Sequence, residues 1–191
     1  MNKLSENFEL NRYGLNARLV NENDAEFIVK LRTQQYNRQY LHSDGLTIDK
    51  QLDWLKLYKE RESLGKDYYF VFLYNKLKVG VVRLYNINDE DFHCGSWVFD
   101  DNIPSFCALA GAIIAREIAF EHLGKTMELN NADGIDSRNK NVQNFMKILG
   151  IELTDERYEG NIKYLVGVLR KEDFVKNKNK IIRFFPKEYQ S

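Results

Sequence analysis

Residues Gly95-Ser96-Trp97-Val98-Phe99 open the stretch that decides the fold, and Gly150 closes it. The opening segment is rich in aromatic and β-branched residues, which is typical of a strand. From Ser105 to Leu123 the pattern is helical, and through Ala115 it is apolar on nearly every side, which indicates a buried helix. Pro104 stands just ahead of it, where the first turn of a helix tolerates a residue without an N–H group. The sequence therefore predicts a strand that leads directly into a buried helix.

A second strand and a second helix complete this unit. Gly124 ends the first helix, and the next residues, 125–129, have the composition of a strand. From about Asn139, apolar residues recur at the spacing of an amphipathic helix, namely Val142, Phe145, Met146 and Leu149. Gly150 stands where a left-handed C-cap belongs.

The junction between the first strand and the first helix is a candidate anion site. N–H groups in the first turn of a helix lack partners and lie at the positive end of the helix dipole. A phosphate or diphosphate suits such a site. The donors would be the backbone groups of Phe106, Cys107, Ala108 and Leu109. On the pattern alone, a plain strand-to-helix connection is the simpler interpretation.

Length and composition favour one globular domain. With 191 residues, of which 43% are hydrophobic, the chain can bury one good core. No linker or internal repeat divides it, so we expect a single domain over residues 1–191 with a basic C-terminal extension at 171–191. The 28 Lys and Arg residues balance the 28 Asp and Glu residues. A net charge of zero argues against a nucleic-acid partner.

Nothing in the sequence points to a membrane, a metal or an oxidising compartment. The N-terminal residues lack the apolar core of a signal peptide. The longest apolar run, Ile103–Ala115, is shorter than the ~20 residues that span a bilayer. Cys94 and Cys107 make no disulfide framework, and the histidines and cysteines lack zinc-ligand spacing. We therefore expect a cytoplasmic protein without a bound metal.

The remaining segments predict a mixed α+β architecture around one twisted sheet. Alternation over residues 13–20 predicts the first strand, and Asn23 and Thr47 are the expected N-caps of two helices. The aromatic and β-branched run at 67–74 predicts a central strand buried on both faces. Further strands are expected at residues 78–87, 92–99, 151–158 and 163–169.

A polar loop, Gln34–Leu46, separates the two N-terminal helices and is the expected acceptor site. Loops of this length inside a compact domain are often functional. The Tyr40 ring can stack on a sugar or a base, Arg38 can pair with a phosphate through its forked donors, and His42 can accept a proton. The alternative is a surface loop that makes no contact with substrate.

Three segments of the chain resemble the GNAT superfamily of acetyl-CoA-dependent N-acetyltransferases. They are Gly95–Phe99, Glu117–Gly124, and Asp136–Val142 with Leu149-Gly150 following at the family's distance. The resemblance covers residues 13–169 and is greatest to the branch that includes ribosomal-protein and amino-sugar acetyltransferases. It implies a single twisted, mostly antiparallel sheet of about six to seven strands flanked by helices.

Two positions depart from the family's pattern. The family's diphosphate loop usually has the form Arg/Gln-x-x-Gly-x-Gly/Ala, whereas this chain has Ile103-Pro104-Ser105-Phe106-Cys107-Ala108 and keeps only the last small residue. Backbone N–H groups can still hold a phosphate, but the glycine that lets the backbone approach closely is lost. Met146 stands where many members carry a tyrosine that protonates the leaving thiolate, a tyrosine that this branch often lacks.

The resemblance implies acetyl-CoA as the co-substrate. The strand around Trp97, Val98 and Phe99 would splay from its neighbour and offer backbone groups to the pantetheine arm and to the oxyanion. The loop residues Phe106 to Leu109 would cradle the diphosphate. Asn139 would bond the pantetheine arm through its amide, while a plain N-cap is its structural alternative.

His93 and Asp91 are the candidates for the base that takes the proton of the amine. A histidine titrates near the working pH of an enzyme, which suits this task. A histidine on a strand is otherwise structural or exposed. His93 and Cys94 point to opposite faces of a strand, so they are not expected to form a nucleophilic pair.

Three functions remain open at this point. The first is acetylation of the primary amine of an amino sugar or sugar nucleotide, and the second is acetylation of a protein N-terminus. The third is a non-catalytic domain that binds acyl-CoA. Zero net charge and the polar loop favour a small-molecule amine, with no nucleic-acid or membrane partner. The segment Phe184-Phe185-Pro186 is expected to dock on the body or on a second subunit of a homodimer.

Overall fold

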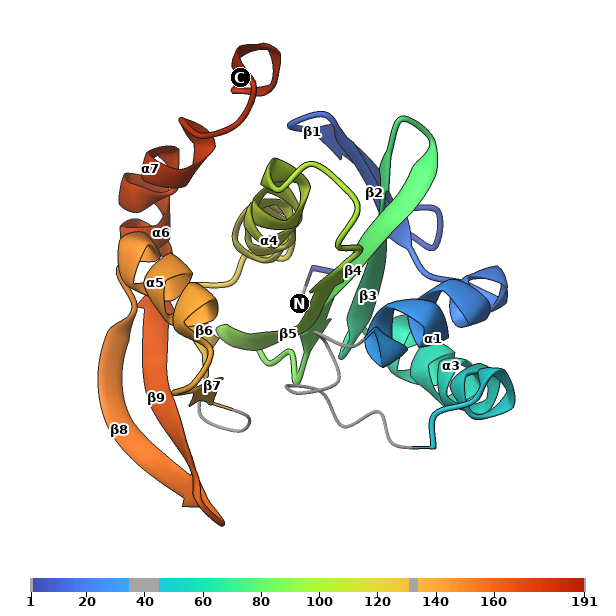
Figure 1. Ribbon diagram of the computed structural model, residues 1–191, viewed down its shortest axis with the longest axis horizontal. Coiled ribbons are helices and arrows are strands. Elements are labelled where there is room, and N and C mark those ends of the chain that lie inside the picture. Colours follow the sequence, from blue (N-terminus) through green and yellow to red (C-terminus); the bar gives the residue numbers. More distant parts are fainter. Residues whose placement is uncertain (1, 35–44, 131–133, 191) are drawn as a thin grey trace.

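The computed structural model describes residues 2–34, 45–130 and 134–190. In Figure 1 one twisted sheet carries α4 on one face and α1 and α3 on the other, and β8 and β9 extend from the body as a two-stranded arm. The sheet follows the order β1-β2-β3-β4-β5-β6-β9-β7, with β8 paired to β9. The strands are β1 Glu9–Arg12, β2 Leu15–Leu19, β3 Tyr68–Tyr74, β4 Leu77–Tyr85, β5 Asp91–Phe99, β6 Met127–Leu129, β7 Ile135–Asp136, β8 Glu152–Glu159 and β9 Ile162–Arg170.

The helices cover both faces of this sheet. They are α1 Ala25–Thr33, α3 Ile48–Ser63, α4 Phe106–Glu117, α5 Lys140–Leu149, α6 Lys171–Asn177 and α7 Asn179–Ile182. Helix α4 continues into a π-helical stretch, Ile118–His122. None of the described helices has the length and apolar character needed to cross a bilayer. The predicted α+β class with a mostly antiparallel sheet is confirmed, since β5 and β6 are the one parallel pair in the described part of the sheet.

The N-terminal strand prediction was wrong in one respect. Residues 13–20 do not form one strand, because Tyr13 and Gly14 make a tight turn that joins β1 to β2. Both residues have positive φ, 51° and 75°, as the favoured two-residue hairpin turns require. Asn21, not Asn23, caps the following turn, and its side chain accepts a hydrogen bond from the backbone N–H of Asn23 at 3.0 Å.

The central strand β3 is buried on both faces, as predicted. Phe70 and Phe72 belong to the core on the α4 side, whereas Tyr69 and Val71 belong to the core under α1 and α3. Strand β5 lies two strands away in the same sheet, so it also separates these two cores.

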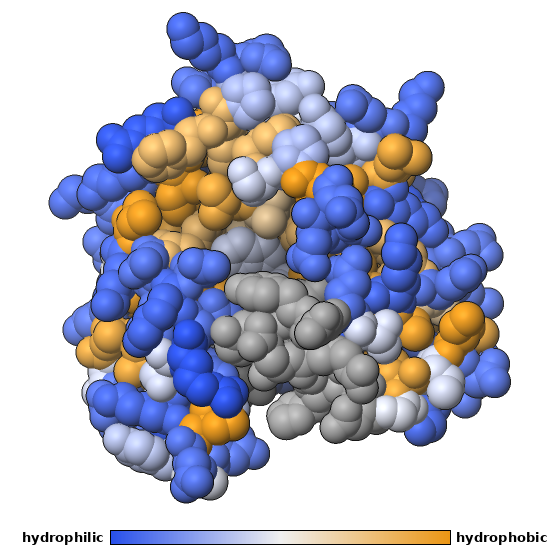
Figure 2. All heavy atoms as spheres, viewed as in Figure 1, coloured by the Kyte–Doolittle hydropathy of each residue, from blue (hydrophilic) through white to orange (hydrophobic). Residues whose placement is uncertain are grey.

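Helix α4 is apolar nearly all round because the C-terminal segment covers the side that the sheet does not. Phe185 lies 5.5 Å from the ring of Tyr13 and 6.0 Å from that of Phe106, so this segment docks on the body. Lys178, in the basic C-terminal extension, pairs with the buried Glu117. Figure 2 shows apolar atoms gathered over the same region of the molecule.

Candidate active site

Strands β5 and β6 pair only where they begin. The paired positions are Asp91 with Met127 and Phe92 with Glu128. Beyond them, β5 has no strand partner on that side among the described residues, while β4 continues to pair with its other edge. The predicted splay of β5 is therefore present, and it leaves backbone N–H and C=O groups available for an extended ligand.

A β-bulge changes the direction of β5 in the part that does not pair with β6. Val81 faces Val98 and Arg83 faces Gly95, so two residues of β5 oppose one residue of β4. Ser96 takes up the extra length with a φ of 47°, which is rare for a residue with a side chain. Bulges of this kind often lie beside active sites because they redirect backbone groups and side chains.

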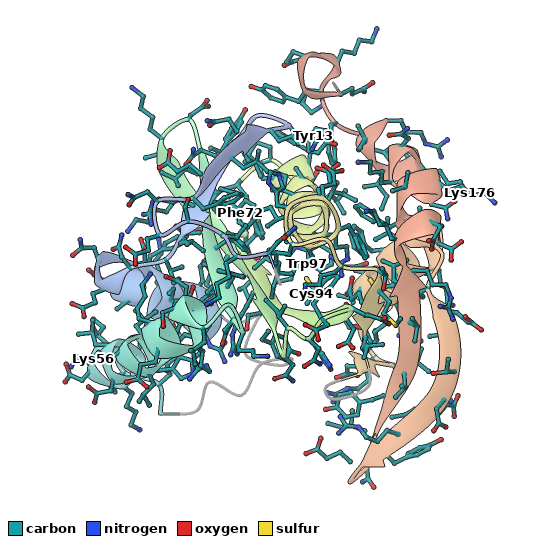
Figure 3. The ribbon with its side chains drawn as sticks, turned by 180° about the vertical axis from the view of Figure 1, so that it is seen from behind. Tyr13, Lys56, Phe72, Cys94, Trp97 and Lys176 are labelled. Carbon is teal, nitrogen blue, oxygen red and sulfur yellow. The ribbon has the colours of Figure 1, made fainter. Side chains whose placement is uncertain are left out.

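Trp97 ties the bulge to the helices behind it. Its indole N–H donates to the carbonyl oxygen of Ala108 at 2.9 Å, and its ring lies 4.7 Å from that of Phe145 on α5. Figure 3 shows Trp97 and Cys94 on the same side of β5, toward α4. The side chain of Trp97 thus has a structural role, and the predicted cofactor residues Trp97 and Ala108 are brought together.

The first turn of α4 has no side-chain cap. Ser105 precedes it, is exposed, and makes no capping hydrogen bond. The backbone N–H of Cys107 bonds to Pro104 at 2.9 Å, which leaves other N–H groups of this turn for a ligand. An anion suits this place electrostatically.

Phe106 occupies the position of the family's glycine, and its ring is packed away in the core. The ring centroid lies 5.6 Å from Tyr74 and 5.6 Å from Tyr189, and Phe185 lies beside it. The Phe106 side chain, which stands in place of the family's glycine, is therefore held against the C-terminal segment. In this respect the first turn of α4 is compatible with the predicted diphosphate site.

The other residues predicted to bind the cofactor differ in how deeply they are buried. Val98, Phe99 and Cys107 are buried, so only their backbone groups can meet a ligand. Ala108 and Leu109 are partly buried. Asn139 caps α5 by accepting from the backbone N–H of Val142 at 3.2 Å, which confirms the structural role and leaves its Nδ2 group for a ligand.

A pocket of about 730 Å³ opens on the other face of β5, between the ends of α3 and β4 and the start of β5. Both predicted base residues, His93 and Asp91, line it, since residues two apart on a strand share a face. The full lining is Arg61, Lys66, Asp67, Arg83, Asn86, Ile87, Asn88, Asp91, His93 and Leu129.

His93 is in the state that a base requires. It is 6% exposed, and its ring lies 5.4 Å from that of Tyr85. Burial lowers the pKa of His93, and Asp91 offsets part of that effect. The imidazole is therefore neutral at neutral pH.

Cys94 lies on the opposite face from His93, as predicted. Burial raises the pKa of its thiol to about 12, so the group stays protonated. It lies near a buried ion pair in which Arg116 donates two hydrogen bonds to Glu128, at 2.7 and 2.8 Å. Met146 contacts the same guanidinium at 3.4 Å. A thioether has no proton to give to a thiolate.

The sequence interpretation missed the basic side of the pocket. Asp67 was taken only as the start of one predicted strand, and Arg83 only as part of the next. The signal for Arg83 was a charged residue among the apolar residues of the strand Leu77–Tyr85. The predicted acceptor residues Arg38, Tyr40 and His42 lie outside the described residues.

No protein-family model and no curated protein sequence matches the chain. Solved structures do match. The apo form of FdhC, a nucleotide-linked sugar GNAT, has 29% sequence identity and a TM-score of 0.79, over 94% of this chain and 99% of that one.

Two other matches have lower sequence identity. RimJ from Mycobacterium smegmatis, in complex with CoA-disulfide, has 12% identity and a TM-score of 0.70, over 92% of this chain and 91% of that one. The ribosomal-protein-S5-alanine acetyltransferase of Vibrio fischeri has 14% identity and a TM-score of 0.70, over 88% and 99%. The chain therefore has the fold of the GNAT acetyltransferases.

Proposed function

We propose that this enzyme transfers the acetyl group of acetyl-CoA to the primary amine of an amino sugar, in nucleotide-linked form. The observation that carries the proposal is the similarity to a nucleotide-linked sugar GNAT, which extends over nearly the full length of both chains at 29% identity. The ribosomal-protein acetyltransferase is similar over a comparable length at 14% identity. A small polar acceptor also fits the volume of the open pocket at His93.

In this proposal the two substrates approach β5 from opposite faces. Acetyl-CoA lies on the α4 side, with its diphosphate at the backbone of residues 106–109 and its pantetheine arm along the free edge of β5. The acceptor enters through the pocket lined by His93 and Asp91. The two meet at the bulge around Ser96, where β5 is open on one side.

The residues then carry the chemistry in a defined order. His93 takes a proton from the ammonium group of the acceptor, and the resulting amine attacks the thioester carbonyl. The backbone N–H of Val98 or Phe99 donates to the oxyanion. As the tetrahedral intermediate collapses, the C–S bond breaks, nitrogen loses its second proton, and the CoA thiolate gains one.

The test is a set of amine acceptors assayed with acetyl-CoA by release of the free thiol. Nucleotide-linked amino sugars should give the highest kcat/KM, followed by free amino sugars. Peptides with N-terminal serine or alanine serve as the competing class. A higher kcat/KM for the peptides would transfer the function to protein N-termini.

Calorimetry with acetyl-CoA, carried out in parallel, separates catalysis from binding. If acetyl-CoA binds and no amine in the set is acetylated, the chain is a binding domain and the proposal is wrong.

A further inference from the structure

We propose that Arg61, Lys66 and Arg83 form an anion subsite that binds a phosphate group of the acceptor. The acceptor would then lie with its phosphate at the end of α3 and its amine at His93. This inference rests on the proposed function and names the part of the acceptor that the pocket recognises.

A buried carboxylate holds two of these cations in place. Asp67 is 1% exposed and immediately precedes β3. Arg83 donates to it through Nε at 2.8 Å and Nη2 at 2.5 Å, and Arg61 donates through Nε at 3.0 Å. Since one carboxylate orients two guanidinium groups, both are fixed before a ligand arrives.

The pairing leaves positive charge and hydrogen-bond donors unused. Asp67 carries one negative charge against the two positive charges of Arg61 and Arg83. Arg61 Nη1 also donates to the carbonyl of Leu57 at 3.2 Å, but Arg61 Nη2 and Arg83 Nη1 make no hydrogen bond with the described residues. Lys66 adds an exposed ammonium group to the same lining. A phosphate can accept these donors, and guanidinium groups bind phosphate well.

Aromatic rings fix the plane of the Arg83 guanidinium. The guanidinium carbon lies 4.9 Å from the ring centroid of Trp54 on α3 and 4.9 Å from that of Tyr85 on β4. The guanidinium faces are thereby occupied, so its edge is left for a ligand. A side chain held in this way loses little entropy on binding.

The subsite and the proposed base lie on one wall of the pocket. Tyr85 contacts both of them, since its ring is 4.9 Å from the Arg83 guanidinium carbon and 5.4 Å from the ring of His93. The pocket volume of about 730 Å³ is in the range that holds a sugar with an attached phosphate. An amino sugar phosphate can therefore reach both ends of this wall at once.

The competing explanation is that these charges only anchor α3 to the sheet. Anchoring accounts for the bonds of Arg61 and Arg83 to Asp67, but it does not account for Lys66 or for the positive charge in excess of Asp67. A structural role predicts losses of stability, whereas an anion subsite predicts losses that depend on the charge of the acceptor.

Binding is tested by calorimetry with UDP, in the presence of saturating CoA so that the diphosphate cradle at α4 is filled. Arg61→Gln and Lys66→Gln should each weaken UDP binding by roughly ten- to hundredfold, the worth of a hydrogen bond between charged groups. Lys56→Gln is the matched control, because Lys56 is on α3, 64% exposed and outside the pocket lining. Figure 3 shows it projecting from the outer side of that helix. It should leave UDP affinity unchanged.

Turnover is tested with glucosamine and glucosamine 1-phosphate as a pair. Arg61→Gln should lower kcat/KM for the phosphorylated acceptor by the same factor that it weakens UDP binding, and should change little for glucosamine. The melting temperature of each variant is measured alongside.

Each result decides between the two proposals. Unchanged UDP affinity in both variants, or an equal loss of kcat/KM for both acceptors, overturns the anion subsite and leaves the acetyltransferase proposal standing. If the wild-type enzyme acetylates no amine, the function proposal fails, and the UDP titrations still determine whether the subsite exists.

Discussion

At His93, burial and a neighbouring carboxylate act on the pKa in opposite directions. Burial is the larger effect and lowers the pKa from its ordinary value of 6.5, while Asp91 raises it. A base must be neutral to accept a proton, so kcat/KM should fall on the acid side through a pKa below 6.5. His93→Gln should lower kcat and remove that acid limb from the profile of kcat/KM against pH.

Tyr85→Phe is the control for this variant. It keeps the ring beside His93 and removes no titrating base, so the acid limb should remain. An unaltered acid limb in His93→Gln would assign the base to another group.

His93 also links stability to acid pH. Its pKa in the folded protein is below that of the unfolded chain, so the unfolded chain binds more protons between the two values. The contribution of His93 to stability is therefore complete above about pH 6.5 and is lost as the pH falls through the folded pKa.

The first turn of α4 is the element on which binding of acetyl-CoA is expected to depend. Ala108 is partly buried there, and its carbonyl already accepts from Trp97. A bulky side chain at this position should keep the diphosphate from the backbone N–H groups. We expect Ala108→Trp to weaken binding of acetyl-CoA sharply in calorimetry.

The matched variant is Lys176→Trp, which places the same side chain on the exposed face of α6 (Figure 3). It should bind acetyl-CoA as the wild type does. Wild-type affinity in a folded Ala108→Trp protein would remove the diphosphate from this turn.

The C-terminal segment offers two adjacent phenylalanines in opposite environments. Phe185 is 3% exposed and packs against Tyr13 and Phe106, whereas Phe184 is 65% exposed. Phe185→Ala should lower the free energy of unfolding by about 3–5 kcal/mol, as is usual for a phenylalanine removed from a core. Phe184→Ala should change it little. Urea denaturation of both variants measures the difference, and equal values would mean that the segment does not dock in solution.

At the scale of the whole molecule, local patterns predicted most of the architecture. The run at 67–74 gave β3, the apolar pattern after Pro104 gave α4, and Gly150 has the left-handed φ of 96° expected of a C-cap. Each of these depends on neighbours along the chain, which a sequence displays directly.

What escaped prediction depends on residues far apart in the sequence. Arg61, Asp67 and Arg83 come from the end of α3, the residue before β3 and the last part of β4, and no local pattern joins them. The turn at Tyr13 was missed because tyrosine is an unusual residue at positive φ, and its ring is held by Phe185 from the other end of the fold. The likeness to a known family supplied the topology but not these contacts.

The cover over α4 has a consequence for how the chain is made. A ribosome synthesises the helix, residues 106–117, before Lys178, which pairs with Glu117, and before Phe185, which packs against Phe106. During that interval the side of the helix that faces away from the sheet lacks its cover, and exposed apolar surface of this kind binds chaperones and aggregates readily. Phe106 has one aromatic neighbour, Tyr74, already made, but it gains the other two only when Phe185 and Tyr189 have been added. The turn proposed to hold the diphosphate is thus among the last parts of the molecule to gain its full set of contacts.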